Sequence, residues 1–212
     1  KRFLYLAGTY KSGITASVIK YFEETIEIIK EAFESIDELT YNKLVGECED
    51  VLKAGGKIIT SGLGKNVPIC EKFEGTMNSY GMDARFLHTN TAVHGDLGIV
   101  RDKDLVILLS KSGNTAETLV LAKQLQKRNC KVWAMTFGRD SKVCKLVHEN
   151  FVMELKDEGD SWNIVPNNST TIYLMVLQAI AIELSKRFAI TREEFGANHP
   201  GGAIGNALGE QL

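Results

Sequence analysis

Hydrophobic residues recur at a helical spacing in the first part of the chain. Residues 15–39 place one at every third or fourth position, with acidic residues between them, which predicts an amphipathic helix. A second helix is expected over residues 41–54, because the pair Gly55-Gly56 is a typical helix end. We expect residues 1–54 to form a helical arm that belongs to the same domain as the rest of the chain.

From Lys57 onward the pattern changes to short apolar runs that alternate with helical segments. Strands are expected at 57–61, 85–88, 104–110, 131–137 and 151–155. Helices are expected at 67–80, 116–128, 142–147 and 169–188. The run 104–110 is almost continuously apolar, as in a strand that is covered on both faces. This alternation predicts an α/β fold: a three-layer, doubly wound, five-stranded parallel sheet of the flavodoxin-like kind.

In such a sheet, ligands bind beyond the carboxyl ends of the strands, near the point where the strand order reverses. The loops at those ends are 61–66, 88–96, 110–117 and 156–169. Candidate chemistry is therefore expected in these loops, within a single domain that covers residues 55–212.

Composition narrows the class of partner. The 212 residues include 25 Lys and Arg against 27 Asp and Glu, a formal net charge of -2. This balance argues against a nucleic-acid partner or an acidic membrane surface, both of which require a basic protein surface. The four cysteines lie far apart, without a Cys-x-x-Cys pair, which favours reduced thiols in a cytoplasmic protein. The most apolar run, 172–184, is interrupted by polar residues and is expected to be a core helix and not a membrane span.

The loop after the apolar strand carries the strongest candidate chemistry. Residues 110–117 read Ser-Lys-Ser-Gly-Asn-Thr-Ala-Glu at the start of a predicted helix. Hydroxyls, a glycine and unpaired backbone N–H groups at that place can cradle a phosphate. Helix capping explains the same residues equally well, since Asn114 and Glu117 have the spacing of a capping box. The sequence contains neither a Walker loop nor a Gly-x-Gly-x-x-Gly fingerprint here, which argues against ATP and NAD.

The neighbouring loops offer polar residues that each have a structural alternative. Lys65 follows a glycine-rich turn and is either directed into the crevice or solvated. His94 could share a metal ion with His88, but their spacing matches no zinc motif.

Three further positions carry the same ambiguity. Glu158 lies in the acidic run 156–160, where a solvated loop is the simpler explanation. Ser169, Thr170 and Thr171 begin a helix, where N-capping explains at least one of them. His199 stands outside any periodic element and has no evident core role, although a single loop histidine is more often structural than catalytic.

Taken together, five motifs occur in an order and spacing that resemble one known family. They are Ser-Gly-Leu-Gly-Lys at 61–65, Val-His-Gly-Asp-Leu-Gly at 93–98, Ser-x-Ser-Gly-x-Thr-x-Glu at 110–117, Pro-x-x-Ser-Thr-Thr at 166–171 and His-Pro-Gly-Gly at 199–202. They closely resemble the sugar isomerase (SIS) domain of bacterial D-arabinose 5-phosphate isomerases, from Gly55 onward. Asn114 and the loop around Trp162 depart from the residues usual in longer members.

The resemblance implies the SIS fold and a set of site residues. Lys65, Glu117, Glu158 and His199 match the polar residues that the family uses in catalysis. The expected substrate-binding residues are Ser61, Gly62, His94, Ser110, Ser112, Gly113, Asn114, Thr115, Ser169 and Thr170.

The implied reaction interconverts D-ribulose 5-phosphate and D-arabinose 5-phosphate through an enediol. Glu117 or Glu158 would be the base, Lys65 would stabilise the developing negative charge, and His199 would assist proton transfer at the oxygens or ring opening. Because a proton only moves between two carbons, no redox cofactor and no metal are expected.

The resemblance further implies a homotetramer that supplies the eight-carbon acid Kdo for lipopolysaccharide biosynthesis. Family members usually add two regulatory CBS modules, and we expect this chain, which stops at Leu212, to be a short form without them. A downstream product such as CMP-Kdo is then the expected inhibitor, entering the same phosphate-binding crevice.

Two alternatives stay open. One is an SIS isomerase for another sugar phosphate, such as a phosphoheptose or hexulose phosphate. The other is a non-catalytic module that senses sugar phosphates, as in SIS-type transcription regulators. Such regulators usually carry a basic three-helix segment ahead of the SIS unit, and the sequence before residue 55 shows no such pattern.

Overall fold

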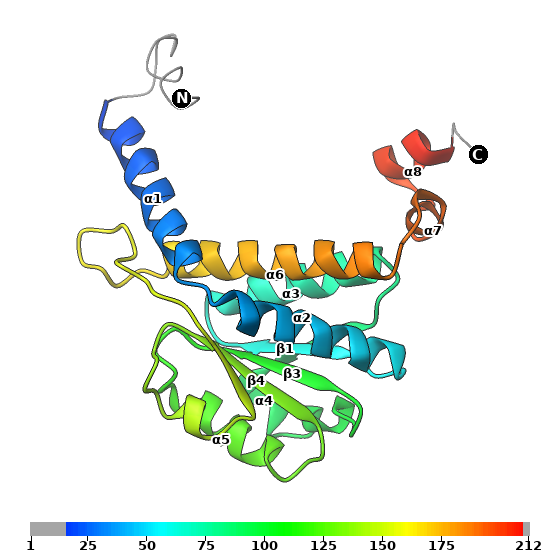
Figure 1. Cartoon of the computed structure of the whole chain (residues 1–212), viewed down its shortest axis with the longest axis horizontal. Coiled ribbons are helices and arrows are strands. Elements are labelled where there is room, and N and C mark those ends of the chain that lie inside the picture. Colours follow the sequence, from blue (N-terminus) through cyan, green and yellow to red (C-terminus); the bar gives the residue numbers. More distant parts are fainter. Residues whose placement is uncertain (1–15, 210–212) are drawn as a thin grey trace.

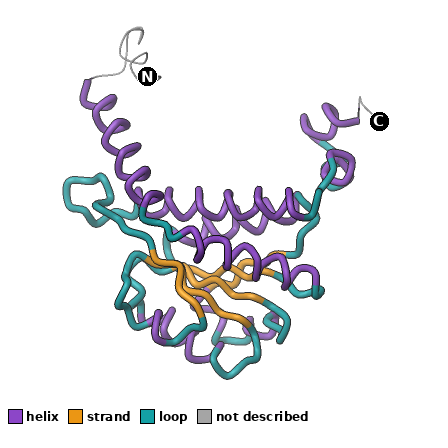
Figure 2. The backbone as a smooth tube through the Cα atoms, in the orientation of Figure 1, coloured by secondary structure: helices purple, strands orange, loops and turns teal. Residues whose placement is uncertain are grey.

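Five strands form one parallel sheet in the computed structural model, which describes residues 16–209 of the chain. The strands are β1 (Ile58–Gly62), β2 (Ala84–His88), β3 (Leu105–Leu109), β4 (Lys131–Thr136) and β5 (Glu149–Val152), in the order β2-β1-β3-β4-β5. All neighbouring pairs are parallel. The predicted doubly wound sheet is therefore confirmed, and Figures 1 and 2 show it between two layers of helices.

The two ends of the chain, residues 1–15 and 210–212, lie outside the described residues. Part of the predicted arm, including its expected helix start at Thr15, and the last residues of the predicted 55–212 domain fall in these segments.

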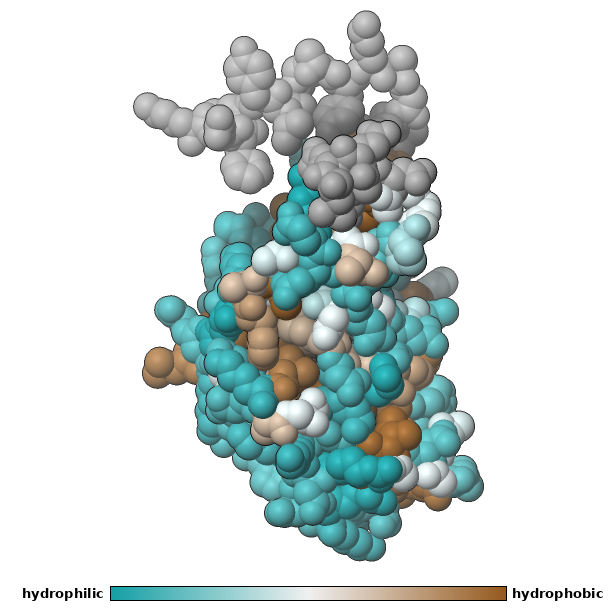
Figure 3. Space-filling view, turned by 90° about the vertical axis from the view of Figure 1, so that its right-hand side faces the viewer, coloured by the Kyte–Doolittle hydropathy of each residue, from teal (hydrophilic) through white to brown (hydrophobic). Residues whose placement is uncertain are grey.

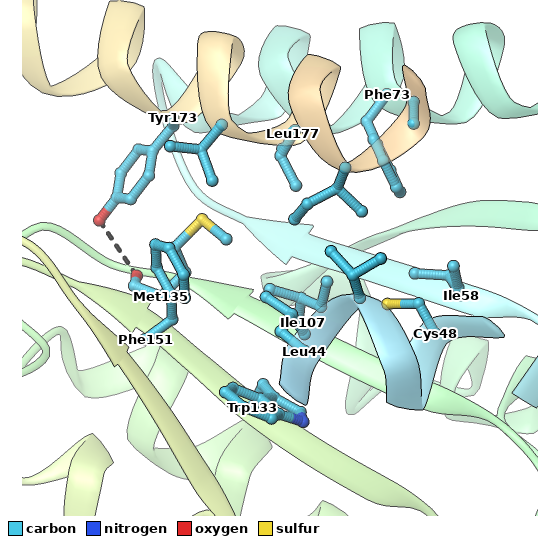
Figure 4. Packing of buried hydrophobic residues seen from close by; sticks show 14 of the residues in the cluster. Leu44, Cys48, Ile58, Phe73, Ile107, Trp133, Met135, Phe151, Tyr173 and Leu177 are labelled. Carbon is cyan, nitrogen blue, oxygen red and sulfur yellow. Dashed lines mark hydrogen bonds between the residues drawn. The ribbon is translucent and has the colours of Figure 1, made fainter. Parts of the chain in front are cut away.

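One face of the sheet is covered by α2 (Glu38–Lys53), α3 (Asn66–Ser79) and α6 (Asn168–Arg187). Alternate residues of β3, such as Ile107, point into this core, because successive side chains of a strand face opposite sides. Figure 4 shows Leu44 of α2 and Leu177 of α6 packed against Ile107 and its neighbours. The buried Tyr173 of α6 donates its hydroxyl hydrogen to the carbonyl oxygen of Met135 at 3.1 Å, which fixes α6 on the sheet.

The opposite face is covered by α4 (Thr89–Ala92) and α5 (Ala116–Leu125). The remaining β3 side chains, Val106 and Leu108, pack there against Leu121 of α5. All five residues of β3 are buried, which explains why its sequence is an unbroken apolar run.

The helix predicted over residues 15–39 is wrong at its C-terminal end, because the structure has two helices there. α1 (Ala16–Glu34) ends early, and α2 begins after a short turn. Asp37 caps α2: its carboxylate accepts the N–H of Thr40 at 2.8 Å. Ile36 packs against the core from within the turn, so the apolar spacing continues through the break and conceals it.

The segment before β5 and the bounds of β5 itself also differ from the prediction. The helix expected at 142–147 is only a 3-10 turn, η3 (Val143–Lys145), and the strand expected at 151–155 begins earlier. Polar residues enter β5 because they find partners outside it. Glu149 forms an ion pair with Lys43 of α2, and the Asn150 amide donates to the carbonyl oxygen of Cys144 at 3.2 Å.

α7 (Arg192–Ala197) and α8 (Gly202–Gly209) follow α6 and form one end of the molecule. A capping box between Thr191 and Glu194 starts α7. Figure 3 views this end, where most side chains are hydrophilic and a few hydrophobic ones gather near the centre. The apolar run 172–184 lies in α6, a core helix as predicted. No helix among the described residues is long and apolar enough to cross a membrane.

Candidate functional site

The carboxyl ends of β1 and β3 lie side by side at the point where the strand order reverses. The chain leaves β1 toward β2 on one side and leaves β3 toward β4 on the other. A crevice opens between two such strands, and this is where sheets of this type bind ligands. Because all strands are parallel, the loops 61–66, 88–96, 110–117 and 156–169 lie at this same edge, as predicted.

The loop after β3, residues 110–115, is held in shape by hydrogen bonds; we call it the serine loop. Its Lys111 carbonyl oxygen accepts the hydroxyl of Thr136, at the end of β4, at 3.1 Å. The hydroxyl oxygens of Ser110 and Thr115 lie 3.2 Å apart across the loop. The serine loop therefore presents its hydroxyls on a fixed backbone at the start of α5, the arrangement that an anion site requires.

The bend of the serine loop depends on glycine. Gly113 has a φ of 62°, and a Cβ atom at this position would lie 2.1 Å from the hydroxyl oxygen of Ser141. The residues on either side complete the bend. The Ser112 hydroxyl oxygen accepts the N–H of Asn114 at 3.1 Å, and the Asn114 amide oxygen accepts the N–H of Lys142 at 3.0 Å.

The capping-box interpretation of Asn114 and Glu117 is wrong. Thr115 occupies the N-cap position of α5 and makes no side-chain cap hydrogen bond. The Asn114 side chain bonds within the loop and to Lys142, as described above. Glu117 stays exposed in the first turn of α5, so capping does not engage its carboxylate.

Glu117 and His94 line one pocket of about 570 Å³. The pocket lies between the α4 segment and α5, and its other lining residues are Thr89, Asn90, Thr91, Val93, Ala116 and Val120. A carboxylate and an imidazole in one open pocket can transfer protons to and from a bound molecule near neutral pH. The structure thus brings together two of the residues expected to form the site.

The end of β1 contributes three expected site residues in different ways. Ser61 is buried, and its hydroxyl oxygen lies 2.9 Å from that of Thr89. A Cβ atom at Gly62 would lie 2.7 Å from the Asn66 Cβ, so this glycine permits the close approach of α3. Lys65 occupies the N-cap position of α3 with an exposed side chain. Of these three, Lys65 is the only one with a charged side chain.

Glu158 is fully buried, so the expectation of a solvated loop is wrong. Its Oε2 accepts the N–H groups of Asn167 at 3.0 Å and Ser169 at 2.9 Å, and its Oε1 accepts the Ser169 hydroxyl at 2.7 Å. The Lys111 ammonium lies 2.8 Å from Oε1. Burial acts to raise the pKa of this carboxyl, but the hydrogen bonds from Lys111, Ser169 and Asn167 outweigh it and hold the pKa below its ordinary value.

Lys111, the ion-pair partner of the candidate residue Glu158, was missed by sequence reasoning. It occupies a variable position in the Ser-x-Ser-Gly motif, so the motif gave no reason to select it. Its partner Glu158 follows β5, and β4 lies between the two loops. The available signal was a lysine in the loop after one predicted strand and a glutamate in the loop after another, both at the carboxyl edge of the same sheet.

Ser169 and Thr170 do not cap α6, contrary to the expectation that N-capping explains one of them. The N-cap position belongs to Asn167. The Ser169 hydroxyl is taken up by Glu158, as described above. The Thr170 hydroxyl donates to the carbonyl oxygens of Asn167 at 2.9 Å and Pro166 at 3.1 Å. Glu158 instead binds the free N–H groups at this helix end.

His199 lies far from the other expected catalytic residues. Its Nδ1 is 2.7 Å from the carbonyl oxygen of Phe195, and the two rings stack with centroids 4.2 Å apart. The adjacent Asn198 donates to the carbonyl oxygen of Ser79, at the last turn of α3. α3 has 14 residues and begins next to Lys65, so its far end is about 20 Å away. His199 is therefore far from Lys65 within one chain, and Figure 1 shows α7, which precedes His199, beyond the last turn of α6.

The histidine pair considered as a metal site has a structural role at one of its members. His88 accepts the N–H of Asn90 at its Nδ1, at 3.3 Å, and thereby caps α4. Among residues 16–209, no group of three or more His, Cys, Asp or Glu side chains is arranged to hold a metal ion.

Comparison with known sequences identifies relatives over most of the chain. The profile of the SIS domain matches residues 51–183. The arabinose 5-phosphate isomerase KdsD of Pseudomonas aeruginosa is 32% identical over 186 residues, which are 88% of this chain and 57% of that protein. The KdsD of Salmonella typhi is 31% identical over the same shares of the two chains. The chain thus spans little more than half the length of these relatives.

Solved structures give the same result. E. coli CFT073 c3406 in complex with arabinose 5-phosphate has a TM-score of 0.81 and 31% identity, over 88% of this chain and 100% of that one. The sugar isomerase domain of the RpiR transcription factor from Sphaerobacter thermophilus has a TM-score of 0.67 and 18% identity, over 84% and 98%. At that identity the second similarity shows the fold alone.

Proposed function

Because the chain belongs to the SIS domain family, we propose that it is a sugar-phosphate isomerase that interconverts D-ribulose 5-phosphate and D-arabinose 5-phosphate through an enediol. The observation that carries this proposal is the pocket that Glu117 and His94 share, directly after the serine loop. Relatives that are arabinose 5-phosphate isomerases, and a similar structure in complex with arabinose 5-phosphate, support the choice of substrate.

We assign the carbon-to-carbon proton transfer to Glu117. The reaction needs a base that removes the proton from C2 of the aldose and delivers it to C1, and a positioned base typically contributes about 10²–10⁴-fold in rate. The sequence left Glu117 and Glu158 as candidates. The exposed carboxylate of Glu117 favours this residue, because the oxygens of Glu158 are occupied and its lowered pKa makes it a weaker base.

The remaining residues bind and stabilise the substrate. The hydroxyls of Ser110, Ser112 and Thr115 and the N–H groups that begin α5 suit a phosphate. Lys65 supplies a positive charge for the enediolate oxygen. Main-chain and small polar groups at Ser61, Gly62, Gly113, Asn114, Ser169 and Thr170 complete the expected substrate contacts.

His199 reaches such a site only from another copy of the chain. We therefore propose an assembly, expected to be a homotetramer, in which α7 of one subunit approaches the carboxyl edge of another. Large hydrophobic side chains exposed on α1 and α6 support such packing: Tyr21, Phe22, Ile26, Met175 and Ile182. His199 would then assist the opening of the sugar ring.

The proposed setting is the cytoplasm, with the product supplying Kdo for lipopolysaccharide. CMP-Kdo, an anion with a phosphate and a sugar acid, would compete with the substrate for the serine loop. Inhibition assays with CMP-Kdo at millimolar concentration test this assignment, and an unchanged rate would remove it without affecting the proposed reaction.

The decisive experiment is proton NMR of the protein with D-arabinose 5-phosphate in D2O. We expect ribulose 5-phosphate to appear, with deuterium entering at C2 of the remaining aldose. If arabinose 5-phosphate is inert and another sugar phosphate exchanges, the substrate assignment is wrong. If every sugar phosphate tested binds without exchange, the chain is a sensor and not an isomerase.

A further inference from the structure

Both carboxylate oxygens of Glu158 have a full set of hydrogen-bond and ion-pair partners. A group that transfers protons to a substrate needs at least one oxygen that the substrate can reach. An ionised carboxylate has about four lone-pair sites. Here Asn167, Ser169 (twice) and Lys111 contact them at 2.7–3.0 Å, so all are occupied. Two backbone N–H groups would already suffice to seat a carboxylate at the start of α6. The Lys111 ammonium is an additional partner from a different loop.

Lys111 is the partner of Glu158 that can leave. The N–H groups of Asn167 and Ser169 belong to the start of α6, and Ser169 is itself buried. The Lys111 side chain is 40% exposed, and a lysine has a flexible four-carbon stem with rotatable donors. A new partner can therefore replace an existing one only at Oε1 of Glu158, where the Lys111 ammonium lies.

The stem of Lys111 is rooted in the serine loop, where the proposed phosphate would bind. Its carbonyl oxygen is fixed by the Thr136 hydroxyl and the Phe137 N–H, both at 3.1 Å, so the backbone stays in place while the side chain moves. A phosphate dianion among Ser110, Ser112 and Thr115 would be a stronger partner for this ammonium than a carboxylate that keeps three other donors.

We propose that Lys111 is a positioning residue with two alternative partners: it holds Glu158 when no substrate is bound, and it turns to the phosphate of a bound sugar phosphate. Its departure leaves Oε1 of Glu158 available to a substrate hydroxyl. Glu158 accepts the proton of the O2 hydroxyl and returns it to O1 within the same turnover, so the carboxylate is regenerated. This inference rests on the proposed function, because it assumes that the serine loop binds a phosphate.

The charges around Glu158 indicate how its pKa changes when Lys111 moves to the phosphate. The titratable groups that face Glu158 are Lys111 from the serine loop and Tyr173 from α6, whose pKa is raised by burial and by Glu158. In the loop that contains Glu158, the carboxylates of Asp157 and Asp160 accept hydrogen bonds from nearby backbone N–H groups. Moving the cation away and placing a dianion nearby both disfavour the ionised form of Glu158, so both raise its pKa toward the range useful for proton transfer.

The test is a carbon-13 NMR titration of the Glu158 carboxyl in protein labelled at glutamate, assigned with Glu158→Gln. In the wild type we expect the pKa of Glu158 to rise when inorganic phosphate or arabinose 5-phosphate is added. In Lys111→Met it should be high with and without ligand. Lys111→Arg, which keeps the charge, should restore the ligand response. Lys186→Met, which removes an exposed lysine of α6, is the matched control and should titrate as the wild type.

Kinetics give a second readout that a merely structural role would not move. In Lys111→Met we expect kcat/KM to fall on the order of 10²-fold. The acid limb of its pH profile should shift to higher pH, because the pH dependence of kcat/KM reports the pKa of Glu158 in the free enzyme. In the Glu158→Gln background the same substitution should have little further effect.

The outcomes separate this inference from the proposed reaction. If the wild type turns over arabinose 5-phosphate but neither ligand changes the Glu158 titration, the inference is wrong and the isomerase stands. If no sugar phosphate is turned over but phosphate still raises the pKa of Glu158, the exchange is supported and the isomerase is wrong. An unchanged Glu158 titration in Lys111→Met overturns the inference in either case.

Discussion

At the scale of single residues, Glu117 and Glu158 show how the fold places one chemical group in two different environments. Glu117 is exposed in the first turn of α5 and lines an open pocket. Glu158 is buried at the start of α6 and is held ionised by its donors. Neither environment follows from the residue type, because the burial, nearby charges and hydrogen bonds that set the pKa of a carboxyl come from the rest of the fold.

Glu117→Gln should therefore abolish most activity without changing stability. The substitution keeps the shape but removes the base, so we expect kcat to fall by about 10²–10⁴-fold. Because Glu117 does not cap α5, the melting temperature should stay close to that of the wild type. Steady-state kinetics and thermal unfolding measure the two effects, with Glu154→Gln at an exposed ion pair as the control. An unchanged kcat with a lower melting temperature would restore a structural role for Glu117.

The thiols should differ in reactivity according to burial. Burial raises the pKa of Cys70 to about 12 and also raises that of Cys48, so both remain protonated and unreactive at pH 8. Cys144 is only partly buried. We expect a disulfide reagent to modify Cys144 first in the folded protein and the buried thiols only after unfolding. Cys144→Ser should remove the fast phase, and fast modification of Cys70 would show that its surroundings open readily.

At the scale of elements, the buried strands fix the positions of the loops that carry the candidate site residues. The serine loop follows a fully buried strand, is tied to the end of β4 and leads directly into α5. Its hydroxyls are held by hydrogen bonds within the loop, and its backbone by a hydrogen bond from Thr136. A site built this way depends on one residue, Gly113, whose positive φ lets the chain turn between the strand and the helix.

Gly113→Ala should consequently damage both stability and substrate binding. A side chain at this φ is strained and would collide with Ser141, which we expect to destabilise the fold by about 1–3 kcal/mol. Gly75→Ala in α3 is the matched control, because a Cβ atom there meets nothing within 4 Å. That substitution should stabilise the protein by about 0.5–1 kcal/mol. Chemical denaturation measures both, and equal effects of the two substitutions would contradict the role given to Gly113.

At the scale of the whole molecule, expected catalytic residues lie at opposite ends of α6. Glu158 binds the start of this helix, and α7 with the following His199 comes after its end. The helix has 20 residues and thus spans about 30 Å. If His199 acts in the proposed site, it must therefore come from a second copy of the chain.

Two variants that are inactive alone should therefore regain isomerase activity when they form mixed oligomers. We expect His199→Ala and Glu117→Gln each to be nearly inactive alone. When the two chains are co-expressed, about one quarter of randomly formed sites would combine an intact Glu117 with an intact His199 from different subunits. Activity assays on mixed oligomers, whose composition is verified by native mass spectrometry, measure the gain. Mixed oligomers without activity would show that the site is not shared in this way.

The local pattern of hydrophobic and polar residues was sufficient to predict the central strands and the order of the elements. The central strands could be predicted because β1, β3 and β4 are buried almost throughout and therefore carry apolar runs. The order of strands and helices then places the four loops at one edge of a parallel sheet. The local pattern failed where a residue's partner is remote: Ile36 hid the break between α1 and α2, and Glu149 and Asn150 entered β5 through contacts with other elements.

The sequence by itself determined the fold class, the edge of the sheet at which the four candidate loops lie and the residue types in those loops. Only the tertiary structure decided the surroundings of these residues. It buried Glu158 beneath the Lys111 ammonium, left Glu117 open beside His94 and carried His199 to the far end of the molecule. The physical reason is that periodicity reports which face of an element is buried, whereas the charge state and partners of a polar group depend on side chains brought together from separate loops.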